Sequence, residues 1–280
     1  MTRAWRSMLY VPANVPRFVA KAPSAGADAV VLDLEDSVPH DRKLEARAAL
    51  KDAVAIAGSG GADVLVRINR PLRLAVADME AAAEAGAQGI FLTKAMGPDH
   101  VRLAAEVLAQ ARQRMVIVPM IETAAALLKV EEIAAASPMI AGVIVGAEDL
   151  ALECRATSDD ELIVLAKRRM VVAAVAAGVA PLGTLGTVAD YRDAEKIRAL
   201  VARSKRSGLV GATCIHPALV PILNEGFSPT AAEIDLAHRQ LAAAVEAGRE
   251  GRGSFTVDGL MVDEPILIRA RRILAQAGVA

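Results

Sequence analysis

Short apolar runs alternate regularly with longer stretches of helical period along this chain. Eight runs of four to six residues, rich in Val, Ile and Leu, recur through the first 215 residues. Each run is almost continuously apolar, as strands that are buried on both faces must be. The eight runs lie at residues 7–11, 29–34, 64–69, 89–93, 116–120, 142–145, 180–185 and 212–215.

The intervening segments place Ala, Leu and Val at helical spacing, with Glu, Lys and Arg on the opposite face. They span residues 42–56, 74–85, 99–113, 124–136, 159–177 and 190–207. Eight strands that alternate with helices predict an α/β fold, a (β/α)8 TIM barrel. An open doubly wound sheet usually carries a glycine fingerprint after its first strand, whereas this chain has VPAN at residues 11–14. We therefore expect a barrel catalytic domain over residues 1–226.

Residues 227–280 have a different character. The sequence TAAE at residues 230–233 is a capping-box signal for a helix that ends near Arg249. Three glycines between residues 248 and 253 then form a hinge, followed by residues 255–263 and a final helix. A hinge of this kind is typical of a lid, or of an arm that packs on another subunit. We expect a C-terminal helical lid extension of the barrel domain.

Composition and charge exclude several classes of partner. The formal net charge is -1, aromatic residues make up 2%, and no basic block is present, which argues against nucleic-acid binding. No apolar run approaches the roughly 20 residues of a membrane span, and the first residues lack the apolar segment of a secretory signal. Cys154 and Cys214 have no metal-binding spacing, which fits a reducing compartment. We expect a cytoplasmic protein.

Polar and charged side chains stand where the predicted strands end. These are Asp33, Glu35 and Asp36 after the second strand, Arg67 and Asn69 on the third, Lys94 after the fourth, Glu122 after the fifth, Glu148 and Asp149 after the sixth, and His216 after the eighth. The carboxyl ends of the strands of a parallel barrel meet at one rim, where barrel enzymes carry their active sites. Because unpartnered charges are costly to bury, this convergence indicates an ion bound among them.

Glu122 and Asp149 are candidate ligands of Mg²⁺. This ion accepts one or two protein carboxylates and completes its octahedron with water and substrate oxygens. The alternative is that each carboxylate caps a following helix or precedes a loop, as the sequence after Asp149 indicates. The residues by themselves leave both interpretations open.

Arg67 interrupts an apolar strand with a planar guanidinium, which suits a substrate carboxylate or an oxyanion derived from a thioester. The alternative is a buried ion pair with the acidic cluster, and the two roles are compatible. We expect Glu35 and Asp36 to orient Arg67 and metal-bound water. Lys94 offers a competing mechanism, a Schiff base with a carbonyl substrate, although an ion pair is the commoner role for such a lysine.

Six short motifs occur in order along the chain: RSMLYVP at residues 6–12, VLDLEDSV at 31–38, VRIN at 66–69, IET at 121–123, GAEDL at 146–150 and CIHP at 214–217. The segment FTVDGLMVD follows at residues 255–263. Together these motifs resemble the HpcH/HpaI aldolase superfamily, and within it the citrate lyase β-subunit (CitE)-like branch. The resemblance covers nearly the whole chain.

The resemblance implies a Mg²⁺ ion held by Glu122 and Asp149, with Arg67 and Glu122 binding the substrate. It implies a malyl-, citramalyl- or citryl-type thioester of CoA or of an acyl-carrier protein, and a homotrimer or hexamer. In this branch Asp263 is expected to reach the active site of a neighbouring subunit as a catalytic acid/base.

The implied reaction is a retro-Claisen or retro-aldol carbon–carbon cleavage through an enolate stabilised by Mg²⁺ and Arg67. Three alternatives stand beside this lyase. They are an acyl-CoA thioesterase that uses the same site, a non-catalytic acyl-thioester-binding subunit, and a class I aldolase that acts through Lys94.

Overall fold

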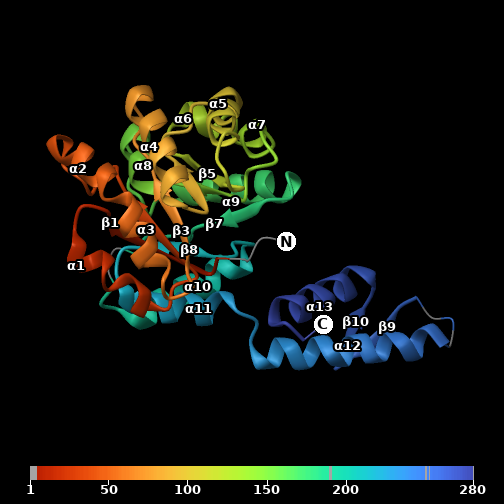
Figure 1. Cartoon of the computed structure of the whole chain (residues 1–280). Coiled ribbons are helices and arrows are strands. Elements are labelled where there is room, and N and C mark those ends of the chain that lie inside the picture. The colour runs from red at the N-terminus through yellow and green to blue at the C-terminus, as the bar shows by residue number, and fades with distance from the viewer. Residues whose placement is uncertain (1–4, 189–190, 250, 252, 280) are drawn as a thin grey trace. The chain divides into compact units, whose positions relative to one another are not determined.

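The computed structural model describes residues 5–188, 191–249, 251 and 253–279. The chain divides into two compact units, Met1–Phe227 and Ser228–Ala280. The first unit holds an eight-stranded parallel sheet and the second a two-stranded hairpin with two helices (Figure 1). Three residues that entered the predictions lie outside the described residues: Asp190 at the start of a predicted helix, and Glu250 and Arg252 in the predicted hinge.

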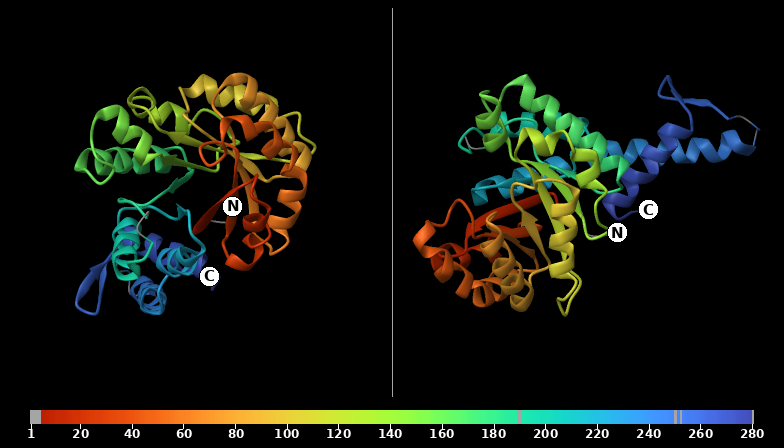
Figure 2. Two further views of the ribbon diagram at one scale, coloured as in Figure 1. Left: turned by 90° about the vertical axis from the view of Figure 1, so that its left-hand side faces the viewer. Right: turned by 90° about the horizontal axis from the view of Figure 1, so that it is seen from above.

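The eight parallel strands form a nearly closed barrel with helices around it, which confirms the predicted TIM barrel (Figure 2). The strands follow the order β7-β6-β5-β4-β3-β2-β1-β8. Strands β7 and β8 meet at one parallel bridge between Leu182 and Gly211, beside a bond of 3.1 Å from the Val210 N–H to the Pro181 carbonyl. The strands are β1 (Ser7–Pro12), β2 (Ala29–Asp33), β3 (Asp63–Arg67), β4 (Gly89–Leu92), β5 (Val116–Ile121), β6 (Gly142–Val145), β7 (Ala180–Leu182) and β8 (Ala212–Cys214).

Each of the six predicted helical segments contains helix, whereas three further helices in the described part of the first unit, at Pro16–Val19, Ala147–Cys154 and Val220–Phe227, were not predicted. The helices of this unit with six residues or more are α2 (Lys43–Ala48), α3 (Leu50–Gly58), α4 (Leu72–Ala85), α5 (Pro98–Leu108), α8 (Ala147–Cys154), α9 (Glu161–Ala176), α10 (Ala194–Arg206) and α11 (Val220–Phe227). Shorter turns of helix are α1 (Pro16–Val19), α6 (Ala124–Leu127) and α7 (Val130–Ala134). The predicted helix at residues 124–136 is divided because Lys129, at φ -118°, leaves the helical region.

Helix α8 corrects one expectation from the sequence. Asp149 does not precede a loop but lies in the first turn of this helix, which ends at Arg155 in the left-handed conformation. The helix escaped the sequence pattern because it has eight residues, of which only Leu150 and Ala151 are buried. Two adjacent buried residues do not show a helical period.

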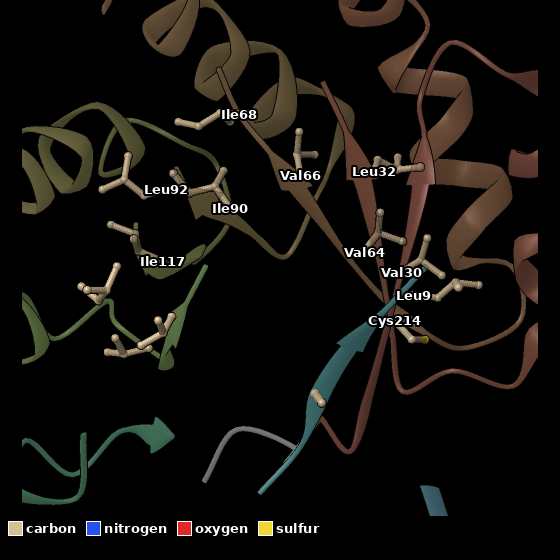
Figure 3. Packing of buried hydrophobic residues seen from close by; sticks show 14 of the residues in the cluster. Leu9, Val30, Leu32, Val64, Val66, Ile68, Ile90, Leu92, Ile117 and Cys214 are labelled. Atoms are coloured by element: carbon tan, nitrogen blue, oxygen red, sulfur yellow. The ribbon is translucent and has the colours of Figure 1, made fainter. Parts of the chain in front are cut away.

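The alternation of side chains along each strand builds two buried layers. In β2, Val30 and Leu32 point outward to the helices, while Ala29 and Val31 point into the barrel. The outward side chains of neighbouring strands form one continuous layer under the helices (Figure 3). The interior layer consists of Trp5, Met8, Ala29, Val31, Leu65, Phe91, Val118, Met120, Ile144 and Leu182. Both faces of the strands are therefore buried, as their continuous hydrophobicity predicts.

The second unit contains α12 (Ala231–Arg249), the hairpin strands β9 (Phe255–Val257) and β10 (Leu260–Val262), and α13 (Glu264–Ala277). The capping box predicted at its start is present. The Thr230 N–H donates to Glu233 at 2.7 Å, and the Glu233 N–H donates to the Thr230 hydroxyl at 3.1 Å. In the described part of the chain, no helix has the length and apolar character needed to cross a membrane.

Candidate active site at the carboxyl ends of the strands

The register of β2 and β3 brings an acidic and a basic side chain together at the rim of the barrel. Asp33 and Arg67 are partners in the parallel ladder. The Arg67 guanidinium donates from Nε to Asp33 Oδ1 at 2.7 Å and from Nη2 to Asp33 Oδ2 at 2.6 Å. Asp33 also accepts the N–H groups of Glu35 at 2.8 Å and of Ser37 at 3.1 Å. This bidentate pair fixes Arg67 at the barrel mouth.

Two further carboxylates contact the same guanidinium. Arg67 Nη1 lies 3.0 Å from Glu35 Oε2 and 3.3 Å from Asp36 Oδ2. Below it, the Arg67 Cζ atom lies 5.0 Å from the centre of the Tyr10 ring. The ion pair with the acidic cluster, which the sequence left as an alternative role for Arg67, is therefore present.

Burial and charge set the protonation of the acidic cluster. Burial acts to raise the pKa of Asp33, but the Arg67 guanidinium and the Ser37 and Glu35 donors outweigh it, so this pKa is lowered from its usual 3.8. For Glu35, burial prevails over the nearby cations and raises the pKa. Asp33 therefore stays ionised to a lower pH than an ordinary aspartate, whereas Glu35 ionises only at a higher pH than an ordinary glutamate.

Lys94 joins this cluster to the next strands along the rim. It adopts the left-handed conformation, with φ 46°, just after β4. Its ammonium lies 2.9 Å from Glu35 Oε1 and 3.6 Å from Asp149 Oδ1. Burial would lower the pKa of Lys94, but the carboxylates of Glu35 and Asp149 raise it above its usual value. A Schiff-base lysine requires the opposite shift, so the structure favours the ion-pair role.

Glu122 follows β5 and is almost completely buried at 2% exposure. Its Oε2 atom accepts the Lys94 N–H at 2.5 Å. The side chain lies directly against Gly146, where an added Cβ would stand 2.7 Å from Glu122 Oε1. Burial, together with the charges of Asp149 and Glu35, raises the pKa of Glu122 to about 7, although the Lys94 N–H opposes the shift. This carboxylate is thus poised between its two protonation states at neutral pH.

Asp149 presents the second candidate ligand from the first turn of α8, with 37% of its side chain exposed. It lines a cavity of ≈ 280 Å³ together with Glu122, Arg67 and Tyr10. The charge of Asp149 also contributes to the raised pKa of Glu122, so the two carboxylates repel each other in the metal-free protein. The strand ends therefore bring together the two predicted ligands and the predicted substrate arginine.

The charges around this cavity fit a divalent cation. The ion-pair network contains Arg67 and Lys94 against Asp33, Glu35, Asp36 and Asp149, and Glu122 adds a further carboxyl group. Negative groups thus outnumber positive ones. No group of three or more His, Cys, Asp or Glu side chains arranged for a metal occurs among the described residues. Two carboxylates are sufficient for Mg²⁺, which retains water and substrate oxygens, so Glu122 and Asp149 are the pair that suits it.

Asn69 and His216, at the ends of barrel strands, serve local structure, whereas Asp263 lies outside the barrel. The Asn69 N–H and side-chain amide donate to Asp78 Oδ2 at 2.9 and 2.7 Å, which ties Asn69 to α4. His216 Nδ1 accepts the Ala218 N–H at 3.2 Å, and its ring stacks on Tyr191. Asp263 belongs to the second unit, where it precedes α13 and makes no side-chain capping bond to that helix.

Among the charged residues of the cavity wall, Lys167 is the one that the sequence did not predict. Lys167 lies on the buried face of α9 with 4% of its surface exposed, and it lines the same cavity as Glu122. Burial lowers the pKa of Lys167 to about 8, with the charge of Glu148 acting in the opposite direction. Lys167 begins the run Lys167-Arg168-Arg169, which is typical of the solvated face of a helix, so the sequence gives no signal that the first of these three side chains is buried.

Comparisons with known proteins identify the family of this chain. The family model HpcH/HpaI aldolase/citrate lyase matches residues 6–217. A (3S)-malyl-CoA thioesterase of Cereibacter sphaeroides is 37% identical over 276 residues, covering 98% of this chain and 94% of the relative. The mitochondrial citramalyl-CoA lyase of Mus musculus is 31% identical over 291 residues, covering 97% of this chain and 86% of the relative.

Among solved structures, CitE from Mycobacterium tuberculosis in complex with magnesium, acetoacetate and coenzyme A superposes with a TM-score of 0.82. It is 30% identical, and the match covers 99% of this chain and 100% of that chain. The family therefore includes enzymes that are lyases and enzymes that are thioesterases. This chain belongs to the HpcH/HpaI aldolase/citrate lyase family, with citrate lyase β-subunit-like proteins among its relatives.

Proposed function

We propose that this protein is a Mg²⁺-dependent carbon–carbon lyase that cleaves a 3-hydroxy-dicarboxylic acyl-CoA thioester of the malyl, citramalyl or citryl type. The observation that carries the proposal is the pairing of Glu122 and Asp149 in one cavity with Arg67. A 3-hydroxy acid offers a hydroxyl and a carboxylate oxygen that can chelate one hard cation together. The names of the malyl-CoA and citramalyl-CoA relatives support this substrate class.

A base removes the proton from the 3-hydroxyl group, and the O–H electron pair forms the carbonyl of a 2-oxo acid. The bond between C2 and C3 of the acyl chain breaks, and its electron pair remains on the thioester fragment as an enolate. A Mg²⁺ ion held by Glu122 and Asp149 would supply positive charge against the substrate oxygens. Arg67 has five N–H donors, of which Asp33 takes two and Asp36 one. Glu35 also lies 3.0 Å from Nη1 of this guanidinium, and Arg67 lines the cavity, where an N–H group that these carboxylates leave free would donate to the developing oxyanion.

A panel of CoA thioesters, assayed with Mg²⁺ and after EDTA treatment, tests the proposal. We expect malyl-, citramalyl- or citryl-CoA to yield a 2-oxo acid and a shorter acyl-CoA, and we expect EDTA to stop the reaction. Binding of CoA esters without any turnover in Mg²⁺ would instead identify a non-catalytic subunit. Labelling of Lys94 by borohydride in the presence of substrate, with activity that survives EDTA, would support the class I aldolase.

Thioester hydrolysis is the second candidate function. The malyl-CoA thioesterase, 37% identical over almost the whole chain, favours it. The same stabilisation of negative charge at the thioester carbonyl serves both outcomes. The panel separates them, because hydrolysis releases free CoA and an intact hydroxy diacid, whereas cleavage releases acyl-CoA and a 2-oxo acid.

The affinity for Mg²⁺ should depend on pH through Glu122. Its pKa of about 7 describes the metal-free protein, and only the ionised carboxylate can hold the cation. Above pH 7 the group is already ionised and the affinity should level off. Below pH 7 each unit of pH should weaken binding by about tenfold, because a proton must leave first.

Calorimetric titration of Mg²⁺ between pH 6 and pH 8 measures this dependence. Repeating it in buffers of different ionisation enthalpy should show about one proton released per ion at the acidic end and almost none at the alkaline end. An affinity that does not change over this range would contradict the assignment of Glu122 as a ligand.

Asp263 is proposed as the acid that protonates the enolate carbon, from a neighbouring subunit of a homotrimer or hexamer. Its carboxylate is half-buried and does not cap α13, so it is not committed to the helix. We expect Asp263→Asn to leave the dissociation constant for the thioester unchanged and to lower kcat by about a hundredfold, because the amide cannot transfer the proton. Equal losses in binding and turnover would instead assign Asp263 to lid packing.

Mixed oligomers test whether Asp263 acts in trans. By itself, each of Asp263→Asn and Asp149→Ala should retain about 1% of wild-type turnover or less. When the two variants are co-expressed in equal amounts, about a quarter of the sites should combine an intact barrel with an intact Asp263 from the next subunit. If Asp263 acts within its own chain, co-expression restores nothing.

A further inference from the structure

Lys167 is a cation that has no role in the proposed reaction. It comes from the middle of α9, where its neighbours on the buried face include Ala166, Met170 and Val171. With 4% of its surface exposed, it is more buried than Arg67 or Lys94, whose side chains are 13% and 33% exposed. A buried ammonium is costly unless a partner compensates its charge.

Within the described residues, Lys167 makes no ion pair. Its ammonium donates to the Gly186 carbonyl at 3.2 Å, and the Thr184 hydroxyl donates to that same oxygen at 2.9 Å. An ammonium group has three N–H donors, so one shared carbonyl leaves its charge and most of its donors unmatched. Glu148 acts on Lys167 only through its charge at a distance.

Arg67 and Lys94 differ from Lys167 in this respect. The guanidinium of Arg67 is paired with Asp33, Glu35 and Asp36, and Lys94 lies between Glu35 and Asp149. That part of the rim carries an excess of negative charge before any ligand arrives. A carboxylate of the substrate would therefore meet repulsion there, except where the divalent cation holds it.

The order of the strands places Lys167 on the other side of the candidate ligand pair. Arg67 ends β3, Glu122 follows β5 and Asp149 follows β6, whereas Lys167 bonds to the segment that follows β7. Lys167, its acceptor Gly186 and the Glu122–Asp149 pair all line one cavity. An acyl group bound beside Glu122 and Asp149 therefore has the acidic cluster around Arg67 on one side and the ammonium group of Lys167 on the other.

We propose that Lys167 is a specificity-determining residue that binds a carboxylate of the acyl group in this cavity, an inference that rests on the proposed function. The ammonium gains in the complex the counter-charge that the free protein does not provide. A hydroxyacyl thioester that lacks this carboxylate would leave the buried cation unpaired, and the protein would discriminate against it.

Two thioesters that differ at one group test the assignment. Malyl-CoA carries a carboxylate on C3, and 3-hydroxybutyryl-CoA carries a methyl group at the same carbon. Dissociation constants for both should be measured by calorimetry with Mg²⁺ present, for the full-length wild type, Lys167→Met and Lys167→Arg. Lys51→Met, which removes an exposed lysine of α3, is the matched control.

We expect Lys167→Met to weaken malyl-CoA binding by at least about tenfold and to change 3-hydroxybutyryl-CoA binding by less than about twofold. Lys167→Arg keeps the charge and should retain most of the preference for malyl-CoA. The melting temperature of Lys167→Met should equal or exceed that of the wild type, because an apolar chain of similar length replaces a buried cation.

Two results would overturn the assignment of Lys167. One is unchanged malyl-CoA binding in Lys167→Met. The other is an equal loss for both thioesters together with a lower melting temperature, which would make Lys167 a structural residue. Each is distinct from failure of the proposed function, in which the wild type itself neither binds nor converts malyl-CoA and both proposals fall.

Discussion

Asp149→Ala is expected to reduce Mg²⁺-dependent turnover by at least about a thousandfold while the barrel stays folded. The loss follows from removal of one of the two carboxylates that suit the cation. The fold should survive because 37% of the Asp149 side chain is exposed, and its contact with Lys94 is a 3.6 Å ion pair that contributes about 1 kcal/mol at most. Turnover measured against Mg²⁺ concentration, together with thermal unfolding, gives both quantities.

The matched control is Glu161→Ala. Glu161 is an exposed acidic residue in the first turn of α9, just as Asp149 is an acidic residue in the first turn of α8. Both substitutions remove a favourable charge from a helix N-terminus, but only Asp149 lines the cavity. Near wild-type turnover in Asp149→Ala would show that Asp149 is not a ligand.

Arg67→Met is expected to destabilise the protein by about 3–5 kcal/mol at neutral pH, besides impairing turnover. The guanidinium is the partner that compensates Asp33, which is 2% exposed, and it also lies against Glu35. Its removal leaves a buried carboxylate without a counter-charge. Denaturant unfolding monitored at several pH values measures the effect.

The pH dependence of this loss identifies its cause. In the wild type the pKa of Asp33 is below its usual 3.8, so this pair stabilises the fold above that pH and loses its effect as the pH falls. In Arg67→Met the pKa of Asp33 should instead rise, because burial is no longer opposed. The difference between wild type and variant should therefore be largest at neutral pH and should shrink toward pH 4.

The control for this experiment is Arg169→Met. Arg169 holds Glu131 with two bonds of 2.9 and 3.0 Å, a geometry similar to that of Arg67 and Asp33, but these side chains are 39% and 54% exposed. Water solvates both charges when the pair is broken, so the loss should be at most about 1 kcal/mol. Similar losses for the two arginines would contradict the role given to burial.

The barrel and the rim of its active site could be predicted because both depend on local patterns. A strand buried on both faces must be apolar at every position, so its end is marked by the first charged residue. Asp33, Arg67 and Glu122 each stand at such an end, and in parallel strands all these ends meet at one rim.

Other features depend on signals that are weak or absent in the sequence. The hairpin between β9 and β10 turns at Asp258 and Gly259, both with positive φ, and this Asp-Gly pair is a usable signal that the sequence reasoning passed over. The sequence carries no comparable signal for Lys167, because the burial of one position on α9 depends on the residues that pack on that helix.

The order of the eight barrel strands, the charged residues at their ends and the family could be predicted, because each depends on short stretches of sequence. The tertiary structure decided which charges are compensated. Arg67 is enclosed by three carboxylates, whereas Lys167, the first of three consecutive basic residues, contacts none among the described residues. Compensation depends on distances between residues far apart in the chain, and only folding sets those distances.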